Sequence, residues 1–297
     1  MYNTLLKYFS KKKRILEHKP VKHIVFRDDE IAKQLQEEGY YIAEFLGENE
    51  RQLLLALYKK YDTSIDNGAG AFFPILSHST QEDINRILEQ SLNKWLKNYK
   101  SIHAFAIKTP GKASKLALHQ DLAVIDEEKY SAVALWIPLQ KVNNLNGAMH
   151  IIPRSQSIFV PYRCGTIPPI YANFENILQP YFKPIYLELG QALFFDSRMF
   201  HYSSPNLSNE NRIVVVCRIY PLESDFVTYY QEEGRKDSRI EMWKRPEDYL
   251  INKNENYGED ARPENCEFLG YRYADTNPLT KVEFEEIRKN LGIIPQP

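Results

Sequence analysis

The sequence predicts a mainly β protein with flanking helices, in which short antiparallel strands form a jelly roll. After about residue 100, apolar residues recur in short runs separated by Gly, Pro, Asn or Asp, which is typical of strands and turns. Few helix-length segments divide these runs, which favours antiparallel pairing, and the 20 Tyr and 15 Phe also favour strands. Seven or eight such strands suit a jelly roll or barrel. The expected strands are residues 102–108, 116–124, 133–139, 148–152, 185–189, 192–195 and 213–220.

Helical patterns occupy the N-terminal third of the chain and its C-terminal end. The first helix should end at Gly39, a residue that readily takes a left-handed conformation, and a short strand follows it. Asn49 is expected to cap the second helix, and Thr80 begins the third, whose apolar stripe belongs to the core. Thr280 and Glu283 have capping-box spacing for a last helix. The expected helices are residues 29–38, 49–61, 80–98 and 280–290.

Charge is unevenly distributed along the 297 residues and indicates three regions. Residues 1–27 form a basic arm with eight Lys/Arg and one Glu, which we expect to be solvated and partly helical, with contact to a membrane surface or nucleic acid as the alternative. Residues 28–221 hold the strand core with its N-terminal helices. Residues 222–297 are polar, with seventeen Asp/Glu against eleven Lys/Arg, and are expected to pack on the core or cover its site.

Composition excludes several classes of protein. The net charge of −1 gives no global field toward nucleic acid or membrane, and no apolar run reaches the length of a membrane span. The three cysteines are scattered and odd in number, which argues against a disulfide scaffold and against structural zinc. No apolar segment of signal-peptide length occurs near the N-terminus, so we expect a cytoplasmic protein. The sequence does not determine the oligomeric state.

A metal site is predicted by three residues. His119 and Asp121 flank Gln120 in an expected strand, where residues two apart point to the same face. His201 follows an apolar strand and could complete the set. Two His and one carboxylate on one face of iron(II) leave the opposite face open for O2 and an oxidisable co-substrate. The His-x-Asp pair alone would also suit a hydrogen-bonded strand pair.

A candidate carboxylate-binding site follows the third ligand. Arg212 lies eleven residues after His201 and opens an apolar strand. A permanently charged fork at the end of a barrel can hold a carboxylate with two hydrogen bonds. Ser203, two residues after His201, places a hydroxyl on the same side.

These spaced residues resemble the phytanoyl-CoA dioxygenase family of iron(II)- and 2-oxoglutarate-dependent oxygenases. The resemblance covers residues 29–221, including the segment Asn144-Leu145-Asn146-Gly147-Ala148-Met149-His150-Ile151-Ile152-Pro153. It implies the cupin-like double-stranded β-helix as the form of the jelly roll. It further implies iron(II) ligands at His119, Asp121 and His201. Arg212 and Ser203 would then hold the distal carboxylate of 2-oxoglutarate, and Gln120 and Trp136 would line the co-substrate or substrate cavity.

One segment departs from the family pattern. The family often continues with Pro-Gly-Ser-His, whereas this chain has Pro153-Arg154-Ser155-Gln156. The departure concerns the loop that follows rather than the iron ligands. Related halogenases replace the carboxylate ligand by a small residue, so Asp121 favours hydroxylation or a related oxidation.

The implied reaction consumes 2-oxoglutarate and O2, releases succinate and CO2, and hydroxylates an unactivated C–H of a small or carrier-bound metabolite. A cupin-type metalloenzyme that works without 2-oxoglutarate is an alternative, and Arg212 argues against it. A non-catalytic binding module on the same fold is another, and the intact ligand set argues against that. No motif identifies the substrate.

Several other polar residues have a structural interpretation in the sequence. His103 and His150 are expected on half-exposed strands, and His18, His23 and His78 in solvated segments. Arg218 has the same strand parity as Arg212 but lies about 20 Å away at the rise of a strand, so it cannot share the 2-oxoglutarate carboxylate. We expect a structural salt bridge, with substrate binding at the other end as the alternative. Lys108 and Lys112 are expected to be solvated loop lysines, with contact to an anionic substrate as the alternative.

The mouth of the jelly roll must be covered to keep water from the site. Residues 156–184 and 222–297 are the long segments outside the strand core that could cover it. Their aromatic side chains would suit a substrate wall, and the alternative is packing on the outside of the barrel. These residues are Tyr162, Tyr171, Phe174, Tyr181, Phe182, Phe226, Tyr229, Tyr230 and Trp243.

Overall fold

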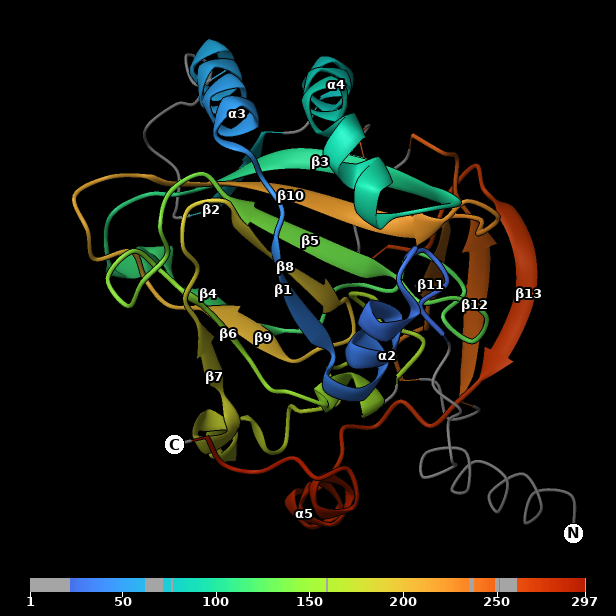
Figure 1. Ribbon diagram of the computed structural model, residues 1–297. Helices are drawn as coiled ribbons and strands as arrows, with labels where there is room; N and C mark the ends of the chain where they lie inside the picture. Colours follow the sequence, from blue (N-terminus) through green and yellow to red (C-terminus); the bar gives the residue numbers. More distant parts are fainter. Residues whose placement is uncertain are drawn as a thin grey trace, which may run out of the picture.

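Two antiparallel sheets face each other and enclose the centre of the molecule (Figure 1). The computed structural model describes residues 22–61, 72–75, 77–158, 160–234, 238–248, 251 and 261–296. The larger sheet has six strands: β1 (Tyr40–Glu44), β8 (Gln191–Asp196), β5 (Val133–Pro138), β10 (Arg212–Pro221), β3 (Tyr99–Lys108) and β2 (Phe72–Ile75), in that order. The smaller sheet has four: β4 (Leu116–His119), β9 (His201–Ser203), β6 (Met149–Ile151) and β7 (Lys183–Ile185). This arrangement confirms the predicted jelly roll.

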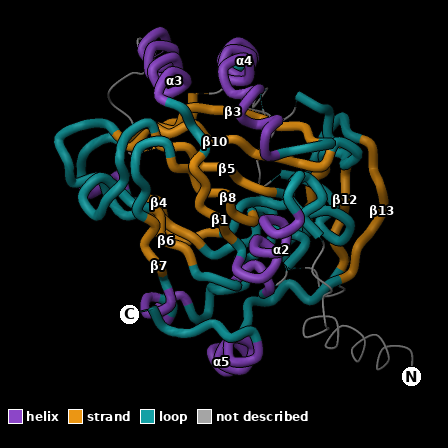
Figure 2. The backbone as a smooth tube through the Cα atoms, viewed as in Figure 1, coloured by secondary structure: helices purple, strands orange, loops and turns teal. Residues whose placement is uncertain are grey.

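Helices cover the outer face of the larger sheet. Figure 2 shows α3 (Glu48–Tyr61) and α4 (His78–Trp95) side by side above β3, while α2 (Asp29–Glu38) leads into β1. Alternation along β10 places Val215, Cys217 and Ile219 against these helices in one buried apolar cluster. The other face of β10 lines the space between the two sheets.

The interior of the jelly roll is apolar at its centre and open at one part. Trp136, Leu193 and Val214 from the larger sheet pack there with Met149 and Ile151 from the smaller one. The inward-facing residues Ala104, Val216 and Arg218 are only half-buried, although their outward-facing neighbours are fully buried. Solvent therefore reaches this part of the inner wall.

The C-terminal segment splits into two parts that pack at different places. One part is the sheet β11 (Val227–Tyr230), β12 (Arg239–Lys244) and β13 (Glu267–Tyr273), beside the main body in Figure 1. The other is α5 (Lys281–Asn290), whose Phe284 is buried against the smaller sheet together with apolar residues of 156–184, called the insertion below. The insertion itself contributes the short 3-10 helices Ser155–Ser157, Glu175–Ile177 and Gln179–Tyr181, and Lys112–Ser114 forms another before β4.

Capping decides where the helices begin and end. Gly39 ends α2 with a φ of 87°, and Thr280 and Glu283 form the expected capping box of α5. Two expectations were wrong. Asn49 lies inside α3, which begins at Glu48. The third helix begins before Thr80, because the side chain of Ser77 accepts the backbone N–H of Thr80 as its cap.

Several other boundaries also differ from the expectations. The strand expected at residues 116–124 ends at His119, and β2, β9 and the C-terminal sheet were missed. Val25 and Phe26 are buried in the core, so the core begins before residue 28; residues 1–21 of the expected arm lie outside the described residues. Within the described part of the chain, no helix is both long and apolar enough to cross a membrane.

Candidate metal centre

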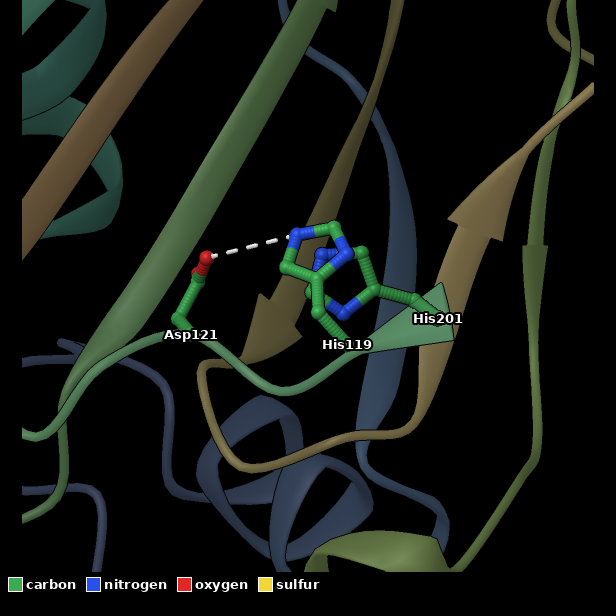
Figure 3. Close-up of side chains that lie close together, drawn as sticks. All are labelled: His119, Asp121 and His201. Atoms are coloured by element: carbon green, nitrogen blue, oxygen red, sulfur yellow. Dashed lines mark ion pairs between the residues drawn. The ribbon is translucent and has the colours of Figure 1, made fainter. Parts of the chain in front are cut away.

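His119, Asp121 and His201 bring their potential ligand atoms together inside the jelly roll (Figure 3). His119 ends β4 and His201 begins β9, and the two residues are direct partners in the antiparallel pairing of these strands. Asp121 lies two residues beyond the end of β4. One ligand atom from each residue lies within 4.8 Å of the others, and His119 Nε2 is 3.9 Å from Asp121 Oδ1. No other such cluster of three is found in the residues that the structure describes.

Backbone carbonyls orient both imidazoles. Nδ1 of His119 lies 2.9 Å from the carbonyl of Ala117, and Nδ1 of His201 lies 3.0 Å from that of Met199. A carbonyl can only accept, so each Nδ1 carries the hydrogen and each Nε2 keeps its lone pair. Two imidazole nitrogens and one carboxylate oxygen therefore converge, and this donor set fits iron(II) with open positions on the opposite side.

The protonation states also suit metal binding. Burial lowers the pKa of His201 to about 3, with the neighbouring His119 as the next cause, so the imidazole is neutral at pH 7. Burial alone would raise the pKa of Asp121. The charge of Arg218, followed by the contributions of the two histidines, outweighs burial and lowers that pKa to about 2. The Asp121 carboxylate is therefore ionised at pH 7.

The segment that carries Asp121 is fixed by a buried ion pair. Arg163 donates to the backbone carbonyl of Asp121 at 2.6 Å and forms an ion pair with Glu127, also at 2.6 Å. The amide of Asp121 donates to the carbonyl of Ser197 in the loop after β8. These contacts replace the strand pairing expected beyond His119, and they hold Asp121 beside the two histidines.

A second cluster, formed by Lys108, Arg212 and Ser203, lies at the other end of the same interior. Lys108 and Arg212 are direct partners across β3 and β10, and they are 0% and 1% exposed. The Lys108 ammonium donates to Ser203 Oγ at 2.6 Å and to the carbonyl of Ser204 at 2.7 Å. Ser203 is two residues from His201 on the same inward face of β9.

Neighbouring residues position the Arg212 guanidinium, but its Nε–H donor stays without a partner among the described residues. Its guanidinium lies 4.9 Å from the ring centroid of Trp136 and donates to the carbonyl of Gly147. Gly147 has a φ of 83°, and a Cβ there would lie 2.5 Å from Cδ of Lys108, so only glycine fits. Two buried cations without a carboxylate partner in this part of the structure are suited to an anion.

The structure brings together most of the residues predicted from the sequence. The three ligand candidates converge, and Arg212, Ser203 and Trp136 lie inside the same jelly roll. Gln120 lies beyond the end of β4, and its side-chain amide donates to the carbonyl of Arg198 at 2.5 Å. Its place in the cavity stays a prediction.

Lys108 and Arg218 were not predicted as site residues from the sequence. The expected strand at residues 102–108 already gave Lys108 the parity of the inward-facing Ala104 and Ala106, and this alternation was the available signal. The expectation of a solvated Lys108 was wrong. The salt bridge expected for Arg218 is confirmed, and its partner is Asp121, at 2.9 Å.

Two histidine expectations were also wrong. His103 is buried under α4 rather than half-exposed, and its Nε2 contacts the Ser101 hydroxyl. His23 is buried, with its Nε2 3.1 Å from Asp196. Both are structural, and neither approaches the ligand cluster. His150 is half-buried as expected and stacks on Tyr202.

The chain was compared with known families and structures. The phytanoyl-CoA dioxygenase (PhyH) family model matches residues 20–214. No curated protein sequence matches the chain significantly. One similar structure is the epimerase SnoN in complex with Fe3+, alpha ketoglutarate and nogalamycin RO, at 15% identity and a TM-score of 0.55, covering 83% of this chain and 97% of that one.

Two further structures share the fold. HygX from Streptomyces hygroscopicus, with nickel and 2-oxoglutarate bound, is 12% identical with a TM-score of 0.51, covering 66% of this chain and 88% of that one. EvdO2 from Micromonospora carbonacea var. aurantiaca is 17% identical with a TM-score of 0.50, covering 65% and 91%. At these identities the likeness concerns the fold.

Proposed function

We propose that this chain, which belongs to the phytanoyl-CoA dioxygenase family, hydroxylates an unactivated C–H bond of a small or carrier-bound molecule and releases succinate and CO2. Membership makes it an iron- and 2-oxoglutarate-dependent oxygenase. The pair of buried cations, Lys108 and Arg212, supports the proposal most directly. Lys108 contacts Ser203, which lies two residues after His201 on β9. A cupin-type enzyme that works without 2-oxoglutarate has no use for this pair.

We assign the iron ligands to His119, Asp121 and His201, whose donor set and protonation states fit the metal. The distal carboxylate of 2-oxoglutarate would meet Arg212, Lys108 and Ser203. Both cations are desolvated before the carboxylate arrives, so charge-assisted hydrogen bonds to it are made in a low-dielectric site. Trp136 keeps the guanidinium plane in place by stacking.

Iron with 2-oxoglutarate and O2 supplies the oxidant, and the protein supplies position and a dry site. Backbone carbonyls hold the Nδ1 atoms of His119 and His201, so that the two Nε2 atoms would be free to bind the metal. The buried cations would hold the far end of 2-oxoglutarate, and the apolar cluster around Trp136 would exclude water from it. Each of these groups is in place before substrate arrives.

Asp121 favours hydroxylation over halogenation. A halogenating site needs a free position where the carboxylate ligand would otherwise bind. Here Asp121 is ionised, buried, and held by Arg218 and by the contacts of its backbone. Ala104 and Val216 are only half-buried on the same inner wall as Arg218, and a substrate C–H group would approach along this wall. A small molecule, or the end of a carrier-bound one, would fit there.

Succinate release tests the proposal. Purified protein is reconstituted with Fe(II) without oxygen, then given 2-oxoglutarate, O2 and a set of candidate metabolites. We expect succinate that depends on both Fe(II) and 2-oxoglutarate, and a product heavier by one oxygen atom with the true substrate. Metal-dependent turnover of a metabolite without 2-oxoglutarate would favour the cupin-type alternative. Binding without any turnover would favour a binding module. Arg154→Gln serves as the control variant for fold and loading, because Arg154 forms an ion pair with Glu38 and contacts none of the three ligand candidates.

A further inference from the structure

We propose that Arg218 is a positioning residue for the iron site, which holds the Asp121 carboxylate in the orientation that the metal requires. The inference rests on the proposed iron site. It assigns to Arg218 a role separate from the binding of 2-oxoglutarate, because Arg212 and Lys108 occupy the opposite end of β10 and its partner.

The contact is direct and comes from a distant strand. Arg218 pairs with Ile102 and Ala134 in the middle of the larger sheet, and its side chain points into the interior. Its Nη2 donates to Asp121 Oδ1 at 2.9 Å. Among the described residues, this is the one side-chain hydrogen bond to the Asp121 carboxylate, and His119 Nε2 approaches it only to 3.9 Å.

Each of the three iron ligands then has one orienting partner. The carbonyls of Ala117 and Met199 hold the two imidazoles, and Arg218 holds the carboxylate. Asp121 needs such a partner, because it lies beyond the end of β4 and the carboxylate torsion of an aspartate is broad. Without Arg218, the carboxylate could turn away from the two Nε2 atoms, and iron would have to restrict it on binding.

The guanidinium also competes for the negative charge of Asp121, which by itself would weaken iron binding. Two effects therefore oppose each other. Removal of a partner that orients a metal ligand typically lowers metal affinity by about 10- to 100-fold, so orientation outweighs the shared charge. We expect the same sign here.

The side chain of Arg218 is 39% exposed, which makes its replacement a usable test. Water can fill the space that a shorter or neutral side chain leaves, so Arg218→Gln should fold. Arg218→Lys keeps the charge but lacks the planar fork. The control is Arg154→Gln, which also removes one half of an ion pair, has a 43% exposed side chain, and touches none of the iron ligands.

Fe(II) affinity is measured without oxygen and without 2-oxoglutarate for the three variants and the unmodified chain. We expect Arg218→Gln to bind Fe(II) about tenfold or more weakly, Arg218→Lys to fall between, and Arg154→Gln to be unchanged. The charge-transfer absorption that appears when 2-oxoglutarate joins Fe(II) should also shift in Arg218→Gln, because the carboxylate ligand changes its donation.

A folded Arg218→Gln with unaltered Fe(II) affinity and absorption overturns the inference and leaves Arg218 a purely structural ion pair. If Arg218→Gln does not fold, Arg218→Lys decides in the same way: an unaltered affinity with only a lower Tm overturns it. Failure of the proposed function is distinguishable, because then the unmodified chain itself would bind no Fe(II) or release no succinate.

Discussion

Lys108 and Arg212 face each other across the β3–β10 pairing, and both side chains are buried with no carboxylate partner among the described residues. Two neighbouring desolvated cations raise the free energy of the protein unless an anion completes the site. The hydroxyl and carbonyl of Ser203 and the carbonyl of Ser204 accept from the Lys108 ammonium, but none of these acceptors carries a negative charge. This pair is therefore the structural sign of an anionic co-substrate, and it gives the first prediction.

Replacing either cation should weaken 2-oxoglutarate binding more than removing the hydroxyl. Loss of one partner from a buried charge pair costs about 2–5 kcal/mol, so Arg212→Met should raise the Kd for 2-oxoglutarate at least about thirtyfold. Ser203→Ala removes one neutral group and should cost about 1 kcal/mol. Titration of Fe(II)-loaded protein with 2-oxoglutarate, without oxygen, measures both. Equal effects would contradict the assigned roles, and Lys108→Met should resemble Arg212→Met.

The affinity for 2-oxoglutarate should depend on pH through Lys108. Burial, with the charge of Arg212 as the second cause, lowers the pKa of Lys108 to about 7. A bound carboxylate favours the charged amine, so its pKa rises in the complex and binding takes up a proton above pH 7. Affinity should be level below pH 7 and fall by up to about tenfold per pH unit above it.

Calorimetry at pH 8 in buffers of different ionisation enthalpy measures this proton uptake. Lys108→Met should bind weakly and lose the uptake, because the titrating group is gone. Proton uptake that persists in Lys108→Met would assign the pH dependence to another group.

His119→Ala and His201→Ala should each abolish Fe(II) binding and turnover. Each change removes one of the two Nε2 ligands, and the remaining pair of donors is too few for a stable site. The fold should survive, because the surrounding clusters are apolar and independent of the metal. Metal content and circular dichroism measure the two effects. Unchanged metal stoichiometry in both variants would refute the ligand assignment.

Arg154 occupies the place of the glycine in the Pro-Gly-Ser-His pattern and has a φ of 69°. The left-handed conformation costs a side-chain-bearing residue about 1 kcal/mol, and the half-exposed ion pair with Glu38 returns about 0–1 kcal/mol. Arg154→Gly should therefore leave the free energy of unfolding nearly unchanged, whereas Arg154→Ala keeps the strain and loses the ion pair. Thermal unfolding should rank Gly above Ala, the reverse of their usual order. A higher melting temperature for Arg154→Ala than for Arg154→Gly would show that the backbone at this position carries no strain.

The insertion and the C-terminal segment should gain protection from hydrogen exchange when substrate binds. Their aromatic residues are packed: Phe174 and Tyr181 contact α5, and Tyr162 lies against Tyr229. The hydroxyl of Tyr171 donates to the carbonyl of Leu118, the residue before His119, which links the insertion to the candidate site. Exchange with and without substrate tests the cover. Changes confined to the surroundings of His119, His201 and Arg212 would make both segments structural.

Local patterns in the sequence were sufficient for much of the fold. The two-residue period of the strands and the capping residues Gly39 and Thr280 act over a few positions, and the structure has them where they were expected. The residues after His119 differ because backbone contacts with Arg163 and Ser197 replace strand pairing there. Arg163 and Ser197 are distant from Asp121 in the sequence, so no local pattern predicts these contacts.

The candidate site divides in the same way. Residue type and spacing identified His119, Asp121, His201 and Arg212, because a ligand set on alternating strand positions leaves a trace in the sequence. The burial of Lys108 opposite Arg212 and the contact of Arg218 with Asp121 depend on which residues face each other across strands. Strand register brings together residues from distant parts of the chain. The sequence does not tell whether a lysine or arginine in a strand faces solvent or another buried side chain such as Asp121. Only the tertiary structure could decide that.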